Sequence, residues 1–194
     1  MTAYGYVGWA LVLASLGACC SARYTDNWRI KLGTAAAVVV AAFAIQLDRV
    51  PLIGFVASVQ SEPSVAMILI LGSHGARSLW PHRLTQPDTG LLHLCIFLLG
   101  SAMYPSALGI GYIDLYAAGY HPYAGIGMLP LAFLLSWFAG TRLLAFWVAL
   151  AVLARGYSVG ESDNAFDYLI DPIIFVYACW RAAAYAWRRY DGAR

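Results

Sequence analysis

Residues 126–155 read IGMLPLAFLLSWFAGTRLLAFWVALAVLAR, a mostly apolar run that decides the fold. As one helix it would be about 45 Å long at 1.5 Å per residue, which exceeds the roughly 30 Å hydrocarbon core of a bilayer. Its middle contains Ala139-Gly140-Thr141-Arg142, a step that favours a turn. The run therefore predicts a helical hairpin with two short arms, 126–139 and 142–155.

The composition of the whole chain agrees with a membrane setting. The 194 residues are 61% hydrophobic and 11% charged, whereas a soluble domain is about one quarter charged. These figures exclude a soluble globular enzyme, a disordered chain and a nucleic-acid binder. They predict an integral membrane protein in contact with membrane lipids.

Five further apolar segments accompany the hairpin. They cover residues 3–22, 32–47, 64–80, 90–108 and 165–188. The chain is therefore predicted to be all-α, a polytopic transmembrane bundle of about seven helices in one integral membrane domain, residues 1–194. Six crossings remain if one arm of the hairpin is re-entrant.

The distribution of charge favours seven crossings. With the N-terminus outside, the cytoplasmic side receives ten basic residues and three acidic ones, a net +7, and the outer side receives two basic and seven acidic ones, a net −5. Because Lys and Arg accumulate in cytoplasmic loops, this orientation fits a bacterial-type inner membrane with a cytoplasmic C-terminus. A single crossing through 126–155 would put the terminal arginines outside.

Two segments on the predicted outer side are rich in polar residues. Residues 104–123 contain five tyrosines, Asp114 and His121, and residues 155–172 contain Asp163, Asp167 and Asp171 at four-residue intervals. On one helix that interval places three carboxylates on one face, where their repulsion calls for compensation by a cation such as Mg²⁺ or Ca²⁺. The predicted catalytic residues are Asp114, His121 and Asp167. The predicted binding residues are Tyr112, Tyr120, Asp163, Asn164 and Asp171.

Structural roles compete with these assignments. Asp171 precedes Pro172, so Asp171 alternatively caps a helix that begins at Pro172. If Asp163 caps the helix instead, Pro172 only kinks it, and Asp167 and Asp171 enter the outer leaflet, where an ionisable residue is a functional candidate. Asp114 follows two glycines and alternatively stabilises a turn, and the tyrosines alternatively anchor the protein at the membrane interface.

Three functions follow from this arrangement. The first is an outward-facing site that binds a cation or a polar lipid or glycan headgroup, with an enzyme acting on a lipid-linked substrate as its catalytic version. The second is a non-catalytic accessory subunit that docks with another membrane or periplasmic protein. The third is a small transporter, although neither an internal repeat nor a polar midplane is evident. The chain has no Gly-x-Ser-x-Gly, P-loop or haem-type pair of histidines, so no motif specifies a reaction.

Overall fold

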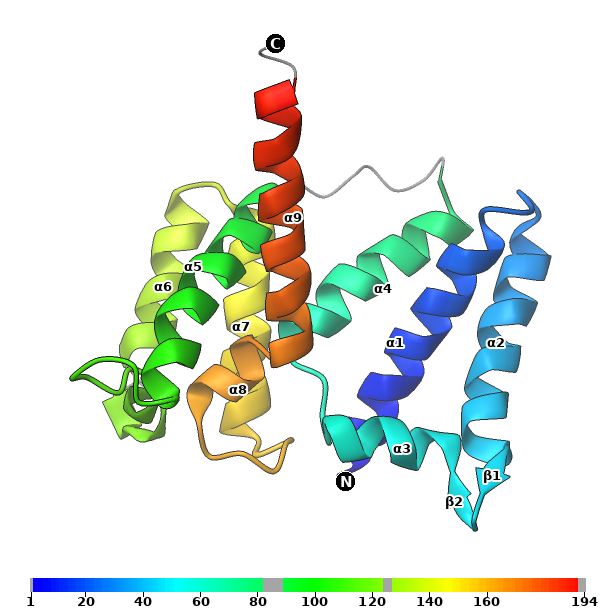
Figure 1. The fold of residues 1–194 in the computed structure, drawn as a ribbon, viewed down its shortest axis with the longest axis horizontal. Helices are drawn as coiled ribbons and strands as arrows, with labels where there is room; N and C mark the ends of the chain where they lie inside the picture. The colour runs from blue at the N-terminus through cyan, green and yellow to red at the C-terminus, as the bar shows by residue number, and fades with distance from the viewer. Residues whose placement is uncertain (1, 82–88, 124–126, 192–194) are drawn as a thin grey trace. The chain divides into compact units, whose positions relative to one another are not determined.

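The computed structural model describes residues 2–81, 89–123 and 127–191, and these are almost entirely helical (Figure 1). The α-helices are α1 (Ala3–Ser21), α2 (Trp28–Ala44), α3 (Leu52–Val59), α4 (Val65–Leu79), α5 (Gly90–Ala107), α6 (Leu129–Phe138), α7 (Arg142–Gly156), α8 (Ala165–Leu169) and α9 (Pro172–Asp191). A short 3-10 helix, η1 (Ala117–Tyr120), and a hairpin of β1 (Gln46–Leu47) and β2 (Val50–Pro51) complete the described elements. The predicted all-α class is confirmed.

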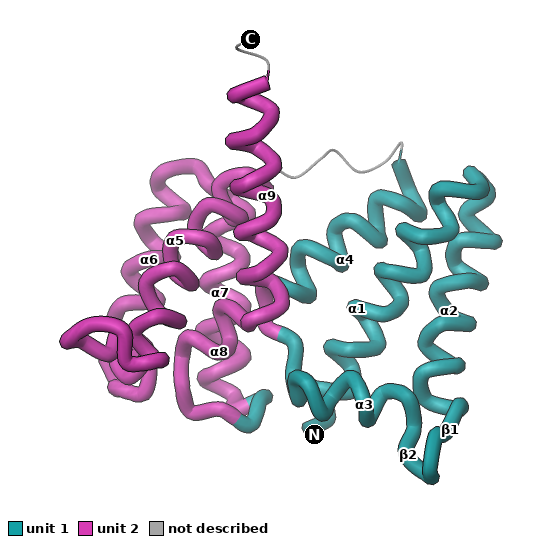
Figure 2. Tube along the Cα trace, viewed as in Figure 1, with its two compact units in different colours: residues 1–63, 67–87, 159–161 teal, residues 64–66, 88–158, 162–194 magenta. Residues whose placement is uncertain are grey.

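The chain forms two compact units (Figure 2). Unit 1 comprises residues 1–63, 67–87 and 159–161, and unit 2 comprises residues 64–66, 88–158 and 162–194. The prediction of one integral membrane domain remains a prediction, and each unit is described separately below.

Unit 1 is built on close crossings of α1 with its neighbours. A Cβ added at Gly17 would lie 3.1 Å from the Cα of Ala35 in α2, and one added at Gly75 in α4 would lie 2.7 Å from the Cα of Ser15. Small residues at such crossings let helix backbones approach closely, as in membrane bundles. Gly17 and Gly75 therefore have a packing role.

The segment predicted as a helix over 32–47 is displaced in the structure. Its helix, α2, begins at Trp28, because the side chain of Asn27 accepts a hydrogen bond from the backbone N–H of Arg29 and caps the first turn. It ends at Ala44, where the chain enters the β1–β2 hairpin. Asp48 and Arg49 take positive φ values of 51° and 65° in the hairpin turn, the conformation that two-residue turns require.

Unit 2 confirms the predicted hairpin of residues 126–155. Helices α6 and α7 pack together, and Gly140 between them has a φ of +74°, a left-handed value that favours glycine. The hydroxyl of Thr141 donates to the Ser136 carbonyl at 2.8 Å and satisfies one of the last carbonyls of α6. The arms are short, since the 10 residues of α6 span about 15 Å.

Helices α5 and α9 run antiparallel and pack side by side (Figure 1). A Cβ at Gly100 of α5 would meet the Phe175 ring of α9 at 2.2 Å, so only glycine fits there without a shift of that ring. The Tyr104 and Phe175 rings are 5.0 Å apart one turn further on. The packing of α5 on α9 thereby fixes the end of the loop that follows Ala107 and the end of the loop that precedes Pro172.

The single helix predicted over 165–188 is two helices. Helix α8 ends at Leu169, and α9 begins at Pro172 after extended backbone at Ile170. The break follows from Pro172, which disfavours helical geometry at the preceding residue. Asp163, Asp167 and Asp171 therefore do not share one helical face, and the alternative in which Pro172 only kinks a helix is wrong.

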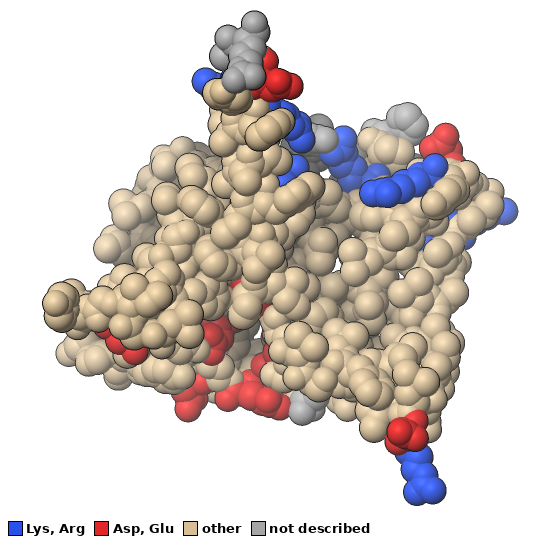
Figure 3. All heavy atoms as spheres, viewed as in Figure 1, with Lys and Arg blue, Asp and Glu red and all other residues tan. Residues whose placement is uncertain are grey.

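Charges gather at the ends of the helices within each unit (Figure 3). In unit 1, Arg23, Arg29 and Arg77 lie where α1 and α4 end and α2 begins, and Glu62 lies at the opposite end. In unit 2, the basic residues Arg142, Arg188 and Arg189 lie at one end and the acidic residues Asp114, Asp163, Asp167 and Asp171 at the other. Three of the charges sorted from the sequence, Arg83, Asp88 and Arg194, lie outside the described residues.

Two of the described helices, α1 and α5, are long and apolar enough to cross a membrane. Only 33% of the apolar window of each is buried, and each helix exposes several large hydrophobic side chains. Exposed Val7 and Leu11 on α1 and exposed Leu94 and Leu98 on α5 are examples.

Candidate functional site: a carboxylate network joining two loops

Asp167 of α8 lies at the centre of a hydrogen-bond network in unit 2. The hydroxyl of Tyr116 donates to both carboxylate oxygens, at 2.8 and 2.9 Å, and the hydroxyl of Ser162 donates to Oδ2 at 2.5 Å. All three residues are half-buried. The carboxylate is therefore held by two neutral hydroxyl donors, one from each of the segments 104–123 and 155–172.

Asn164 ties the same two segments together through buried atoms. Its side-chain oxygen accepts from the Phe166 backbone N–H at 2.9 Å and caps α8, while its amide nitrogen donates to the Tyr116 carbonyl at 3.0 Å. Asn164 is fully buried. Gly119 lies so close that a Cβ there would be 1.8 Å from the Asn164 side-chain oxygen. The two outer segments that the sequence singled out are therefore in direct contact.

Asp114 has the turn-stabilising position that was the alternative to catalysis. Its Oδ1 accepts from the Ala117 backbone N–H at 3.1 Å, at the entrance to η1. The neighbouring Leu115 N–H donates to the Ser106 hydroxyl at 3.1 Å, which fixes the loop to the end of α5. The Asp114 side chain is exposed.

Asp171 caps α9, as its position before Pro172 suggested. Its Oδ1 accepts from the Ile174 backbone N–H at 2.8 Å, and its Oδ2 accepts from the Ser64 backbone N–H at 3.0 Å. The residue is only 4% exposed, and its negative charge faces the positive end of the α9 dipole. Both carboxylate oxygens of Asp171 thus bind backbone groups.

His121 and Asp163 lie at the exposed rim of this region. The His121 ring stacks on the Tyr123 ring with centroids 5.0 Å apart and an interplanar angle of 14°. The Asp163 carbonyl accepts from Arg155 at 3.2 Å. Over residues 2–81, 89–123 and 127–191, no three His, Cys, Asp or Glu side chains are grouped so that they could hold a metal ion. The convergence of carboxylates expected around Mg²⁺ or Ca²⁺ is therefore not found there.

The tyrosines divide into buried and exposed sets. Tyr116 packs edge-on against Tyr120, with ring centroids 5.9 Å apart at 85°. Tyr112, Tyr120 and Tyr123 are exposed, and Tyr112 is fully so. Ile110 and Ile113 beside Tyr112 are 69% and 72% exposed. The network thus braces a loop whose outer surface consists of tyrosine and isoleucine side chains.

Two residues of the network, Tyr116 and Ser162, were not among the predicted site residues. In the sequence, Tyr116 is one of five tyrosines in its segment, and nothing distinguishes it from the others. Ser162 precedes Asn164 by two residues, and its hydroxyl accepts from the Asn164 N–H at 3.0 Å. That local Ser-x-Asn turn was the one signal available for Ser162.

The environment of Tyr116 raises the pKa of its hydroxyl well above 10, first because burial disfavours the phenolate and second because the hydroxyl donates to Asp167. The folded state therefore retains this proton above pH 10, where the unfolded state loses it. By linkage, we expect the free energy of unfolding to fall as the pH rises above about 10 and to be unaffected by this group below that pH.

Denaturant unfolding between pH 8 and 11.5 measures this effect. Tyr116→Phe has no hydroxyl to titrate, so its stability should fall less steeply above pH 10 than that of the wild type. Tyr112→Phe, at a fully exposed tyrosine, is the matched control and should keep the wild-type slope. Equal slopes for all three proteins would contradict the assignment.

Comparisons with protein-family models, with curated proteins and with solved structures give no match to this chain.

Proposed function

We propose that the chain is a multipass protein of a bacterial-type inner membrane, with its N-terminus outside and its C-terminus in the cytoplasm. The observation that supports this orientation is the unequal distribution of charge in each unit, where most basic residues lie at one set of helix ends and most acidic residues at the other. The described exceptions are Asp26 and Asp191 among the basic residues and Arg49 and Arg155 among the acidic ones. Seven described helices of 10 or more residues overlap the predicted segments, namely α1, α2, α4, α5, α6, α7 and α9. The shorter of these helices, such as α4 at about 22 Å, cross with local thinning of the bilayer.

Reporter fusions test the orientation. A fluorescent protein fused after residue 194 should fluoresce, because it folds in the cytoplasm, and alkaline phosphatase fused after Gly160 should be active, because it requires the periplasm. The fluorescent protein fused after Gly160 is the matched control and should stay dark. A dark C-terminal fusion together with an active C-terminal phosphatase would overturn the seven-crossing arrangement.

The outward loop 108–123 is the functional surface in this proposal, and its role is recognition of another membrane or periplasmic protein. Its acidic neighbours Asp114, Asp167 and Asp171 accept hydrogen bonds from other groups of the same unit, so they support the loop. The groups left exposed are Ile110, Tyr112 and Ile113. Tyrosine and aliphatic side chains on a preorganised loop suit protein recognition, since they add contact area at low entropic cost.

Site-specific photo-crosslinking in intact cells tests recognition. A benzoylphenylalanine residue at position 112 should give one protein adduct of defined mass. Ile110→Ala/Ile113→Ala, introduced into the same probe-bearing chain, should weaken that adduct. The same probe at Tyr24, an 88% exposed tyrosine in unit 1, is the control and should give no such adduct. Crosslinks from position 112 to lipid alone would overturn the accessory-subunit function. They would indicate that the loop anchors the protein at the membrane interface.

Headgroup binding at Asp167 is the second candidate function. It is favoured by one observation, the half-buried Asp167 carboxylate with the hydroxyls of Tyr116 and Ser162 beside it, which together offer acceptors and donors to a polar lipid or glycan. Ser162→Ala should then weaken binding of a headgroup probe and leave the Tyr112 adduct unchanged. Catalysis by Asp114, His121 and Asp167 remains a prediction.

A further inference from the structure

The second half of α9 extends beyond the helix on which α9 packs. The Tyr177 ring contacts the ring of His93, in the first turn of α5, with centroids 5.4 Å apart. Because α5 and α9 are antiparallel, residues after Tyr177 pass the start of α5, as the protruding end of α9 in Figure 1 shows. At 1.5 Å per residue, α9 continues about 16 Å past Gly90.

This protruding segment, residues 180–191, combines aromatic and basic side chains. The four aromatic residues are between 59% and 70% exposed, and they are Trp180, Tyr185, Trp187 and Tyr190. The three arginines are also exposed, against a single acidic residue, and they are Arg181, Arg188 and Arg189. Arg181 thus lies beyond the start of α5, outside the part of α9 that packs on α5.

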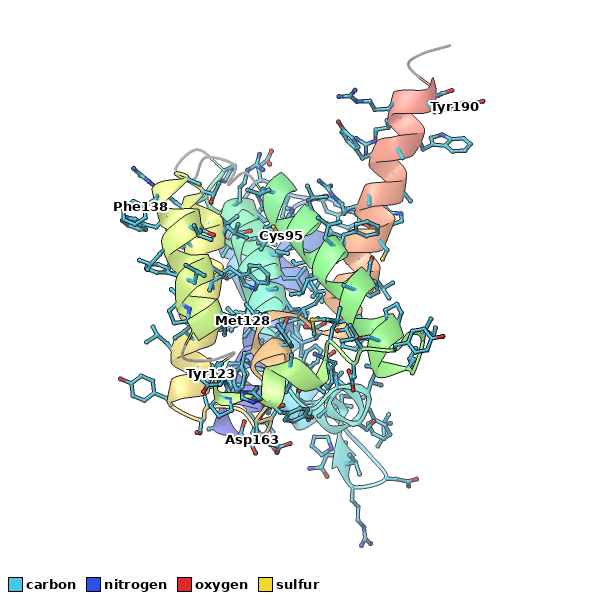
Figure 4. All side chains as sticks on the ribbon, turned by 90° about the vertical axis from the view of Figure 1, so that its left-hand side faces the viewer. Cys95, Tyr123, Met128, Phe138, Asp163 and Tyr190 are labelled. Carbon is cyan, nitrogen blue, oxygen red and sulfur yellow. The ribbon has the colours of Figure 1, made fainter. Side chains whose placement is uncertain are left out.

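The two kinds of side chain occupy different sides of the segment. At about 100° per residue, Trp180, Trp187 and Tyr190 share one side, and the arginines share another. The guanidinium carbon of Arg189 lies 5.5 Å from the Tyr185 ring centroid, and its Nε donates to the Tyr185 hydroxyl at 3.1 Å. Figure 4 shows side chains radiating from the end of α9, where Tyr190 is labelled. Tyr185 therefore holds the Arg189 guanidinium in place through one hydrogen bond and a ring contact.

We propose that residues 180–191 bind anionic phospholipid headgroups at the cytoplasmic membrane surface. The arginines pair with phosphate oxygens, and the tryptophans and Tyr190 lie among the headgroups, where aromatic rings are enriched. The net positive charge of the segment complements the negative potential of a cytoplasmic leaflet. This inference rests on the proposed orientation, which puts the end of α9 on that side.

A lipid fits these observations better than an acidic soluble protein does. The segment is continuous with a bundle helix, so it lies where that helix leaves the hydrocarbon core and enters a headgroup layer about 5–8 Å thick. Its aromatic residues begin at Trp180, one turn past the Tyr177 contact, and recur to Tyr190. That spread is about 15 Å along the helix axis, about twice the depth of the layer, so the segment crosses the headgroup layer and emerges from it.

Native mass spectrometry of the purified full chain tests the proposal with dioleoylphosphatidylglycerol and dioleoylphosphatidylcholine as probes. The wild type should bind phosphatidylglycerol more tightly. Arg188→Gln/Arg189→Gln should weaken phosphatidylglycerol binding roughly 25-fold, because each basic residue near an anionic surface contributes about fivefold. Phosphatidylcholine binding should change little, and added salt should reduce the preference.

A charge-matched variant and a membrane assay make the result decisive. Arg49→Gln/Arg155→Gln removes two positive charges at the opposite helix ends and should retain the phosphatidylglycerol preference. Equal loss in both double variants, or no preference in the wild type, would overturn headgroup binding by α9. Resistance of the chain to carbonate extraction is measured in parallel: extraction of the wild type would refute the membrane proposal itself, whereas a resistant chain without lipid preference refutes only this inference.

Discussion

Asn164→Ala is expected to lower the free energy of unfolding by about 3 kcal/mol, a large effect for a single polar side chain. The variant removes the cap of α8, which is the hydrogen bond from the Phe166 N–H, and it also leaves the Tyr116 carbonyl without the Asn164 amide. Each group left without its partner costs about 1–3 kcal/mol. Thermal unfolding in detergent, followed by the reactivity of the four free cysteines, measures the change.

Two further substitutions separate the contributions of Asn164. Asn164→Asp keeps the oxygen that caps α8 and removes the donor to Tyr116, so it should cost less than the alanine variant. Asn27→Ala removes an exposed cap of α2 and should cost only about 1 kcal/mol. A loss at Asn164 no larger than that at Asn27 would show that the contact between the two loops contributes little.

The same variant has a consequence for recognition. Because Asn164 holds the Tyr116 carbonyl, loosening it should release the loop that presents Tyr112 and Ile113. We therefore expect Asn164→Ala to weaken the Tyr112 crosslink even at temperatures at which the helices remain folded. Retention of the full crosslink would indicate that the loop is ordered by its partner alone.

The parts of the fold that were predictable are those with a local cause. An apolar run of 30 residues is too long for one crossing, and Ala139-Gly140 supplies the turn, so the α6–α7 hairpin followed from residues 126–155. The start of α9 followed as one of two alternatives, from Pro172 and the residue before it. Both depend on neighbours within a few positions.

The parts that were not predicted have distant causes. The Tyr116 hydroxyl bonds to a carboxylate 51 residues away, and no feature of the segment marks that tyrosine among five. Regular spacing suggested one face for Asp163, Asp167 and Asp171, but the Asp171-Pro172 step breaks the helix between them. Helix α3 and the β1–β2 hairpin are too short to leave a periodic pattern.

Asp171→Ala is expected to have an effect of similar size in the core of unit 2, about 2–4 kcal/mol of unfolding free energy. The carboxylate accepts from two backbone N–H groups. The Ile174 N–H is three residues away, in the first turn of α9, and the Ser64 N–H is 107 residues away in the sequence. Its loss removes the α9 cap, the interaction with the helix dipole and the bond to Ser64.

The conservative variant distinguishes this structural role from the binding role predicted for Asp171. Asp171→Asn keeps one acceptor oxygen and a good capping side chain, so it should recover much of the stability lost in the alanine variant. If the charge of Asp171 bound a ligand, the Asp171→Asn variant would fold normally and still lose the Tyr112 adduct or headgroup binding. Both carboxylate oxygens already bind backbone N–H groups. We therefore expect Asp171→Asn to retain the Tyr112 adduct and headgroup binding, because the role of Asp171 is to cap α9.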